Sequence, residues 1–172
     1  MESNKTWVLT DLPKGRKVVK GRWVYKIKRD GRYKARWVAK GFEQRPGIDF
    51  DETYASVVRA VRPLFALAAI HNWEIEQMDV KTAFLHGNIE EEVYVEQPHG
   101  YNDDNTQVCS LKKALYGLKQ SPRAWYHTLR IFLESLGFTT VQADQAVFIN
   151  KTSQIIVTSY VDDLLLFGKT DR

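Results

Sequence analysis

The chain has little cysteine and no long hydrophobic run, and these absences exclude several classes of protein. A single cysteine, Cys109, among 172 residues excludes an internal disulfide framework and a cysteine-rich zinc site, and it favours a reducing compartment. The first residues are polar and lack the hydrophobic segment of a secretory signal, so we expect no secretion. The longest apolar runs, residues 64–70 and 164–167, are too short to cross a bilayer.

Charge is distributed unevenly along an otherwise ordinary globular composition, with 44% hydrophobic and 27% charged residues. Residues 1–41 hold 13 Lys or Arg and 3 Asp or Glu, a net charge of +10, whereas residues 42–172 have a net charge of −6. Such a basic segment on an acidic body is typical of a protein with a polyanionic partner.

A basic hairpin is predicted within the N-terminal segment. Apolar and basic residues alternate over 23–28, Asp30-Gly31 is typical of a hairpin turn, and residues 33–39 form the returning strand. Seven basic residues fall within this short segment: Lys26, Lys28, Arg29, Arg32, Lys34, Arg36 and Lys40. Such a run is usually a solvated face, but arginine and lysine on one strand face also suit phosphate binding.

A helix is predicted to begin at Ser121, with Pro122 in its first turn and Gly137 as its C-terminal stop. Apolar residues follow at helical spacing, and we assign them to the core: Trp125, Leu129, Phe132 and Leu136. An earlier helix has Pro63 in its first turn and continues to His71.

The remaining pattern predicts strands and polar loops. Five further strands are expected, at residues 74–80, 92–97, 146–149, 155–160 and 164–167. Residues 43–56 and 98–107 are predicted loops, with Asp49, Asp51 and Glu52 solvated in the first. The order of elements predicts an α+β fold with a mainly antiparallel sheet packed on helices.

Two adjacent carboxylates, Asp162 and Asp163, stand between the apolar runs of the last two predicted strands. Like charges this close repel, and their removal from water is costly without a cation. Carboxylate oxygens bind Mg²⁺ together with water and substrate phosphates. The alternative is a solvated hairpin turn, the commoner explanation for an isolated Asp-Asp pair.

A third carboxylate, Asp79, ends a predicted strand. Taken alone it is equally well explained as a strand-ending cap. Together with the later Asp pair it fits two-metal phosphoryl transfer, in which strands of one sheet bring carboxylates around two ions about 3.5–4 Å apart. One ion activates the attacking 3′-hydroxyl, and the other holds the triphosphate and stabilises the pyrophosphate leaving group.

Four segments resemble the motifs of copia-type LTR-retrotransposon reverse transcriptases. Residues 78–87, MDVKTAFLHG, resemble motif A, residues 114–125, ALYGLKQSPRAW, resemble motif B, and residues 160–163, YVDD, resemble motif C. Residues 23–26 and 33–41 resemble the fingers hairpin. The order and spacing of the four segments make the resemblance specific, and it covers almost the whole chain.

The resemblance implies an RNA-directed DNA polymerase from a retrotransposon polyprotein, with a fingers–palm fold. It places a fingers-type basic hairpin and loop at about residues 1–62, and the palm with motifs A, B and C at about residues 63–172. Members of the family continue into a thumb and an RNase H domain. We therefore expect a fragment that ends just after the last catalytic strand, with the thumb absent.

The catalytic carboxylates implied by the resemblance are Asp79, Asp162 and Asp163. Asp79 and Asp162 would bind metal directly, the Val80 carbonyl would add a ligand, and Asp163 would support the site. The implied cofactor is two Mg²⁺ ions, for which Mn²⁺ can substitute.

The resemblance also implies contacts with the incoming nucleotide. Phe84 would crowd the sugar 2′ carbon and exclude ribonucleotides, although plain core packing is the alternative for this ring. Gln120 would touch the nucleotide and the template, and Lys28 and Arg36, with Lys34, would contact the triphosphate.

The implied partners are an RNA or DNA template with its primer, and dNTPs. Tyr160 would lie near the primer terminus, and Lys26 and Lys40 near primer or template phosphates. The implied location is a cytoplasmic virus-like particle, with nuclear access left open. Two other hypotheses stay open: a non-catalytic nucleic-acid-binding remnant, and, more remotely, another palm-type nucleotidyltransferase.

Overall fold

The computed structural model describes residues 4–101 and 106–169, so residues 102–105 of the predicted loop 98–107 lie outside the described residues. Contacts divide the chain into two compact units. Unit 1 comprises Met1–Tyr54 and Phe84–Trp125, and unit 2 comprises Ala55–Ala83 and Tyr126–Arg172. Within the described ranges, neither helix has the length and hydrophobicity that crossing a bilayer requires.

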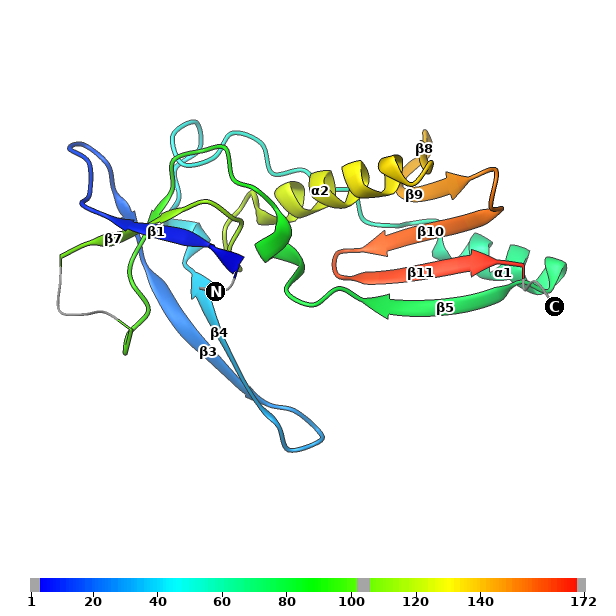
Figure 1. Ribbon diagram of the computed structural model, residues 1–172, viewed down its shortest axis with the longest axis horizontal. Helices are drawn as coiled ribbons and strands as arrows, with labels where there is room; N and C mark the ends of the chain where they lie inside the picture. The colour runs from blue at the N-terminus through cyan, green and yellow to red at the C-terminus, as the bar shows by residue number, and fades with distance from the viewer. Residues whose placement is uncertain (1–3, 102–105, 170–172) are drawn as a thin grey trace. The chain divides into compact units, whose positions relative to one another are not determined.

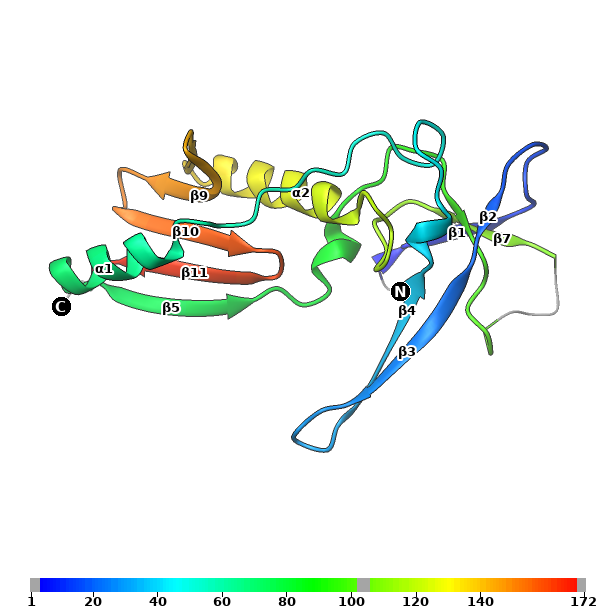
Figure 2. The same ribbon diagram turned by 180° about the vertical axis from the view of Figure 1, so that it is seen from behind.

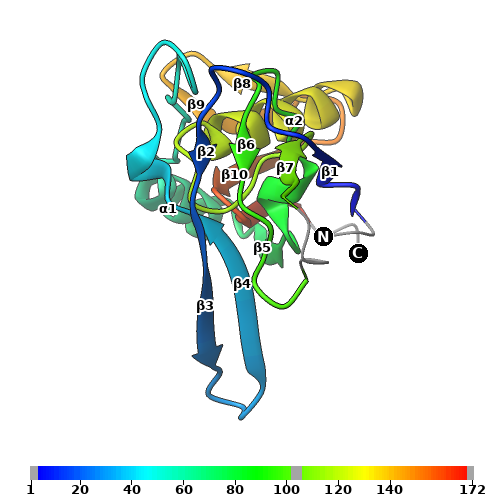
Figure 3. The same ribbon diagram turned by 90° about the vertical axis from the view of Figure 1, so that its left-hand side faces the viewer.

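Unit 1 contains a small four-stranded sheet in the order β1-β7-β6-β2, whose strands lie side by side in Figure 3. The bounds are β1 Trp7–Thr10, β2 Val18–Val19, β6 Tyr94–Val95 and β7 Val108–Leu111. The β2–β6 pair is parallel, and the other two pairs are antiparallel. The strand predicted at 92–97 shrinks to β6, and the patterns did not predict β1, β2 or β7.

The predicted hairpin is confirmed as a separate two-stranded sheet of β3, Gly21–Ile27, and β4, Tyr33–Ala39. Its turn contains Gly31 at φ 81°, a left-handed conformation that favours glycine. The hairpin extends away from β2, β6 and β7 (Figure 3), and only its base joins the core of unit 1.

The core of unit 1 is built from the small sheet, the hairpin base, the short 3₁₀ helix η3 Ala83–His86 and residues 115–118. A second short 3₁₀ helix, η2 Gly41–Glu43, follows β4. Its buried residues are Val19, Trp37, Ala39, Leu85, Val93, Val95, Leu111, Leu115 and Leu118. Cys109 is also buried, in β7, and burial raises the pKa of its thiol to about 12. This cysteine is therefore a packing residue.

The loop at residues 43–56 is anchored by a buried polar network. Asp49 is 6% exposed, which corrects the prediction that it is solvated. Its carboxylate accepts hydrogen bonds from the backbone N–H and Nε of Arg45, at 2.7 and 3.3 Å. Its carbonyl accepts from Gln120 Nε2 at 3.0 Å. Hydrogen bonds supply the partners that a solvated carboxylate would find in water, and no hydropathy pattern reports them.

Unit 2 contains a five-stranded antiparallel sheet in the order β5-β11-β10-β9-β8 (Figure 1). The bounds are β5 Glu74–Asp79, β8 Thr139–Val141, β9 Asp144–Asn150, β10 Ile155–Tyr160 and β11 Asp163–Gly168. Four of these strands were predicted, and β8 was not. Among the described residues β5 pairs with β11 alone, so it is an edge strand, and all of its residues are exposed.

Helix α1, Val61–His71, packs on this sheet through Leu64 and Ala68, which contact Val147 and Phe167 (Figure 2). Pro63 lies in its first turn, as predicted. The helix start is held by Asp144 at the beginning of β9. One carboxylate oxygen of Asp144 accepts hydrogen bonds from the backbone N–H groups of Arg59 and Ala60, at 2.7 and 3.0 Å.

Helix α2, Ser121–Ser135, begins and ends as predicted. Gly137 at φ 83° closes a Schellman motif, in which the Phe138 N–H donates to the Leu133 carbonyl at 3.1 Å. The predicted core stripe is partly wrong. Trp125, Leu129 and Leu133 are buried, whereas Phe132 and Leu136 are 58% and 53% exposed. The buried residues stand four apart and form one stripe of the helix, so Phe132 lies beside this stripe and Leu136 follows the last helical residue.

The α+β prediction is confirmed, because the described chain combines two α-helices with largely antiparallel strands. The strands form three sheets rather than one. The assignment of residues about 1–62 to fingers and about 63–172 to palm stays a prediction.

Replacing Asp144 tests its role at the start of α1. In Asp144→Ala the backbone N–H groups of Arg59 and Ala60 lose their acceptor, so the free energy of unfolding falls by about 1–3 kcal/mol. Urea unfolding measures the loss. Gln142→Ala, an exposed neighbour, is the control and changes stability by less than about 0.5 kcal/mol. Equal stability of both variants would contradict this role.

The Asp49 network predicts a pH-dependent stability. Burial alone would raise the pKa of Asp49, but the backbone N–H and guanidinium of Arg45 outweigh it and hold the pKa below its ordinary 3.8. The ionised carboxylate therefore stabilises the fold above pH 3.8, and this contribution is lost as pH falls through the lowered pKa.

Asp49→Asn should accordingly cost about 1–3 kcal/mol at pH 7, and the difference from the unsubstituted chain should shrink below pH 3.8. Urea unfolding at several pH values measures it, with the exposed Asp51→Asn as a neutral control. A difference that stays constant from pH 7 to pH 3 would show that the charge of Asp49 is irrelevant.

Candidate active site

The three predicted carboxylates lie at one end of the unit 2 sheet. Asp79 is the last residue of β5, and Asp163 is the first residue of β11. These two residues are direct cross-strand partners, so their side chains share one face of the sheet. Asp162 precedes Asp163 in the turn, and its carbonyl accepts a hydrogen bond from the Val80 N–H at 2.9 Å. The sequence prediction that two strands of one sheet bring these residues together matches this arrangement.

The turn that carries Asp162 is strained. Tyr160 and Asp163 are paired, which leaves a two-residue hairpin loop of Val161 and Asp162. Val161 has φ 59°, a conformation that hairpin turns normally assign to glycine and that is rare for a β-branched residue. Such strain costs about 1–3 kcal/mol and is concentrated at functional sites. The backbone here is held against its local preference, which fixes the place of the Asp pair.

The donor set fits Mg²⁺. Asp79 and Asp163 are both exposed and carry like charges on directly opposite positions, a destabilising arrangement that a cation offsets. Gln77 Nε2 donates to Asp163 Oδ1 at 3.3 Å, which engages part of this carboxylate. In the described part of the chain no three acidic, histidine or cysteine side chains already form a cation site. Mg²⁺ commonly uses one or two protein carboxylates and completes its shell with water and substrate phosphates.

The predicted cations of the hairpin lie in unit 1, and several share a face. Lys26 is paired with Lys34, and Arg36 with Val24, so these side chains project from one side of the β3–β4 ribbon. Like charges directly opposite each other destabilise a strand pair. Lys28 follows β3 in the turn. The pairing of Lys26 with Lys34 is therefore a local cost that an anion would remove.

Arg36 and Phe84 both lie against the Tyr116 ring within unit 1. The guanidinium carbon of Arg36 lies 5.5 Å from the centre of the Tyr116 ring, and the Phe84 ring lies 4.8 Å from the same ring. Arg36 and Phe84, both predicted to contact the nucleotide, thus both touch the ring of Tyr116. Sequence reasoning placed Tyr116 in motif B and gave it no role, and no signal in one sequence could have singled it out.

Two glycines allow the loop carrying Tyr116 to lie directly on the end of β4. The Ala39 N–H donates to the Tyr116 carbonyl at 2.8 Å. A Cβ on Gly41 would lie 2.0 Å from the Gly117 carbonyl oxygen, and one on Gly117 would lie 2.1 Å from the Ala39 carbonyl oxygen. The approach of the two backbones thus excludes any side chain at either position.

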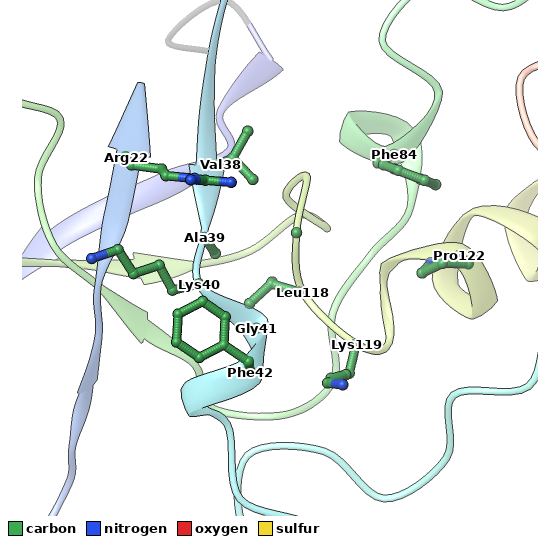
Figure 4. Close-up of a pocket in the computed structure, with 11 residues that line it drawn as sticks. Arg22, Val38, Ala39, Lys40, Gly41, Phe42, Phe84, Leu118, Lys119 and Pro122 are labelled. Carbon is green, nitrogen blue, oxygen red and sulfur yellow. The ribbon is translucent and has the colours of Figure 1, made fainter. Parts of the chain in front are cut away.

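A pocket of about 520 Å³ opens beside this contact, as Figure 4 shows. Its lining includes the predicted residues Lys40 and Phe84, together with the basic residues Arg22 and Lys119. The exposed ring of Phe42 lines the same pocket. The mixture of cations and aromatic rings suits a ligand that has both phosphates and flat bases.

Gln120 lies elsewhere in unit 1, inside the network that anchors the 43–56 loop. It is 3% exposed, its Oε1 accepts from Gln44 Nε2 at 3.0 Å, and its Nε2 donates to the Asp49 carbonyl at 3.0 Å. Its amide reaches a nucleotide only if these bonds are exchanged. Tyr160 is exposed at the end of β10, next to the Asp turn.

Comparison with known proteins agrees with the sequence motifs. The family profile described as reverse transcriptase (RNA-dependent DNA polymerase) matches residues 4–172. The chain is 47% identical, over 98% of its length, to the retrovirus-related Pol polyprotein from transposon TNT 1-94 of Nicotiana tabacum. It is 43% identical over 96% of its length to that from transposon RE1 of Arabidopsis thaliana, and 36% identical over 90% to the transposon Ty1-BL Gag-Pol polyprotein of Saccharomyces cerevisiae.

The chain spans only 14%, 12% and 9% of these three curated relatives. The family profile covers nearly the whole of this chain, including the sheet end with the three carboxylates and the basic hairpin. The resemblance to copia-type elements is thereby confirmed, and the chain belongs to the reverse transcriptase (RNA-dependent DNA polymerase) family of Ty1/copia-type retrotransposon Pol polyproteins.

Proposed function

We propose that this chain carries the polymerase site of an RNA-directed DNA polymerase and transfers a nucleotidyl group from a dNTP to a primer 3′-hydroxyl. The observation that carries the proposal is the cross-strand pairing of Asp79 with Asp163, beside the strained turn that holds Asp162. Family membership supports the reaction class. The site is exposed, as required for a macromolecular template and primer.

The residues at the sheet end have distinct roles in this proposal. Asp79 and Asp162, with the Val80 carbonyl, would hold two Mg²⁺ ions, and Asp163 would support the site through its hydrogen bond with Gln77. Bound Mg²⁺ would lower the pKa of the primer hydroxyl and neutralise charge on the triphosphate. Tyr160 lies next to the Asp turn and supports the primer terminus. The pairing of Tyr160 with Asp163 and the hydrogen bond from Val80 to the Asp162 carbonyl hold this strained turn, and with it Asp162, in place.

The residues of unit 1 bind the triphosphate, sugar and template. Arg36, Lys28 and Lys34 contact phosphates, and bidentate hydrogen bonding makes Arg36 the strongest of them. The Phe84 ring, held against Tyr116, excludes a 2′-hydroxyl. Gln120 fixes the motif B loop through Gln44 and Asp49.

Phosphates of the primer and template are assigned to a second set of cations in unit 1. Lys40 lines the pocket beside the Tyr116 loop, and Lys26 lies on the same side of the hairpin as Arg36. The proposal places the enzyme in a cytoplasmic virus-like particle, since relatives include proteins named Gag-Pol polyproteins.

The second candidate function is a nucleic-acid-binding remnant without catalysis. The observation that favours it is the basic β3–β4 hairpin, whose cations suit a polyanion without any need for the three carboxylates. Both candidates predict template binding, and they differ in primer extension.

Asp162→Asn separates the candidates. Primer extension on an RNA template with Mg²⁺ or Mn²⁺ should fall by at least about 100-fold, because the substitution removes a metal-binding charge, while primer–template affinity stays within about two-fold. Extension of a labelled primer and fluorescence anisotropy measure the two quantities. The exposed Asp51→Asn is the matched control and keeps full activity. If the unsubstituted chain binds primer–template but extends no primer at any protein concentration, the remnant reading holds.

Phe84→Ala tests the sugar gate. Removing the ring opens space beside Tyr116, so incorporation of ribonucleotides relative to deoxyribonucleotides should rise by about ten-fold or more. The ratio of kcat/KM for the two nucleotide classes is the measurement. Phe132→Ala, an exposed phenylalanine on α2, is the control. An unchanged ratio in Phe84→Ala would assign this ring to packing.

A further inference from the structure

Tyr116 contacts two residues that the proposed function assigns to different parts of the nucleotide. The guanidinium carbon of Arg36 lies over its ring, 5.5 Å from the ring centre. The Phe84 ring lies 4.8 Å from the same centre, with the two ring planes at 60°. Arg36 is assigned to the triphosphate and Phe84 to the sugar, and a nucleotide carries its phosphates on that sugar. Both contacts of Tyr116 therefore affect a single bound ligand.

The backbone that carries Tyr116 is anchored on both sides. Leu115 and Leu118 are buried, and the Leu118 N–H donates to the Leu115 carbonyl at 3.3 Å, which closes a turn. Gly117 has φ 93°, the positive value that the third residue of a type II turn requires. The Ala39 N–H donates to the Tyr116 carbonyl at 2.8 Å. Tyr116 is half-buried, so an anchored backbone carries a side chain that is still partly accessible.

The contact with Tyr116 holds the Arg36 guanidinium without using its hydrogen-bond donors. A cation over a ring is attracted by the ring quadrupole and needs no acceptor atom. Within residues 4–101 and 106–169, none of the ion pairs with a carboxylate involves Arg36. A carboxylate would occupy the paired N–H donors with which arginine binds phosphate. Tyr116 thus orients this arginine and does not compete with phosphate for it.

The contact with Tyr116 also supports the Phe84 ring. Phe84 is half-buried, whereas its neighbour Leu85 is buried in the core of unit 1. A ring that excludes a 2′-hydroxyl has to stay in one rotamer, because rotation of the side chain would open the space beside the sugar. The spacing and tilt of the two rings are those that aromatic pairs prefer, so the pair favours one position of Phe84.

We propose that Tyr116 is a positioning residue of the nucleotide site, which orients Arg36 for the triphosphate and supports Phe84 as the sugar gate. This role rests on the proposed polymerase function, since a dNTP is the ligand that joins the two contacts. Two separate properties then depend on one side chain. Affinity for any nucleoside triphosphate depends on the π electrons of the ring, through Arg36, and the preference for deoxyribose depends on its bulk, through Phe84.

Three substitutions at Tyr116 separate these properties. Tyr116→Phe keeps the ring and should leave both within about two-fold. Tyr116→Leu keeps apolar bulk beside Phe84 but has no π electrons, so affinity for dATP and for ATP should fall alike, by about two- to five-fold. Tyr116→Ala removes both, so the ratio of dATP affinity to ATP affinity should also fall, by at least about three-fold. A purely structural defect would lower the two affinities together and leave their ratio unchanged.

The measurement is isothermal titration calorimetry with dATP and with ATP, which differ only at the 2′ position. The 172-residue chain is in complex with an RNA template, whose next base is uracil, and a dideoxy-terminated primer, with Mg²⁺ present. The primer has no 3′-hydroxyl, so nucleotide binding is measured without chemistry. Tyr54→Leu, at another tyrosine of unit 1 that is 65% exposed, is the matched control and should leave both affinities unchanged.

A double variant tests whether Tyr116 acts on the sugar through Phe84. Phe84→Ala alone removes the gate, so adding Tyr116→Ala should change the ratio of the two affinities by less than about two-fold. Effects that multiply in the double variant would mean that Tyr116 contacts the sugar independently, and they would contradict the positioning role.

Three other results would also overturn this role: the same affinity ratio in Tyr116→Ala as in the unsubstituted chain, equal effects of Tyr116→Phe and Tyr116→Leu, or no binding of either nucleotide. Failure of the polymerase proposal has a different signature. A chain that binds dATP but does not extend an ordinary primer would overturn that proposal alone, and the affinities would still report on Tyr116.

Discussion

The main constraint on this fold is the placement of like charges directly opposite each other on paired strands. Asp79 faces Asp163 in unit 2, and Lys26 faces Lys34 in unit 1. Each pair weakens its own sheet, because opposite positions on neighbouring strands are the closest cross-strand contacts. Bound counter-charges would offset both costs. Under the proposed function these would be metal cations at the acidic end and phosphates at the basic hairpin.

The surrounding fold keeps the residues around these charges in conformations that their local sequence does not favour. In unit 2 the Val161 turn keeps a backbone conformation that valine avoids, and the hydrogen bond between Val80 and Asp162 ties β5 to the same turn. In unit 1 the contacts of Tyr116 with Arg36 and Phe84 depend on the close approach of Gly41 and Gly117, which places the motif B loop directly on β4. In both units, local stability is thus lower than it could be, and a few side chains are fixed in position.

Sequence patterns predicted the elements that are stabilised by neighbours in the chain. The β3–β4 hairpin follows from Asp30-Gly31, and the end of α2 follows from Gly137, because a turn and a helix cap are local. Strands such as β1 and β7 are short and pair across about a hundred residues, so their own residues carry little signal. Phe132 and Leu136 were misplaced because the buried stripe of α2 continues from Leu129 to Leu133, and the sequence pattern does not decide between Phe132 and Leu133.

In the candidate site, too, local sequence patterns predicted some features, and contacts between distant segments determined the others. The pairing of Asp79 with Asp163 followed from two strand-end patterns, since carboxylates at strand ends of one sheet meet at its edge. The burial of Gln120 and Asp49 could not be predicted, because side-chain hydrogen bonds between distant segments produce no periodic pattern in the sequence. Tyr116 entered the site through contacts with Arg36 and Phe84 that come from three separate parts of the chain.

The glycine contact between Gly41 and Gly117 also has a mechanical meaning. No side chain fits between the two backbones, and Ala39 donates a hydrogen bond to Tyr116, so the end of β4 and the motif B loop are in direct backbone contact. A displacement of the end of β4 is therefore passed to the loop that carries Tyr116 with no flexible side chain between them to absorb it.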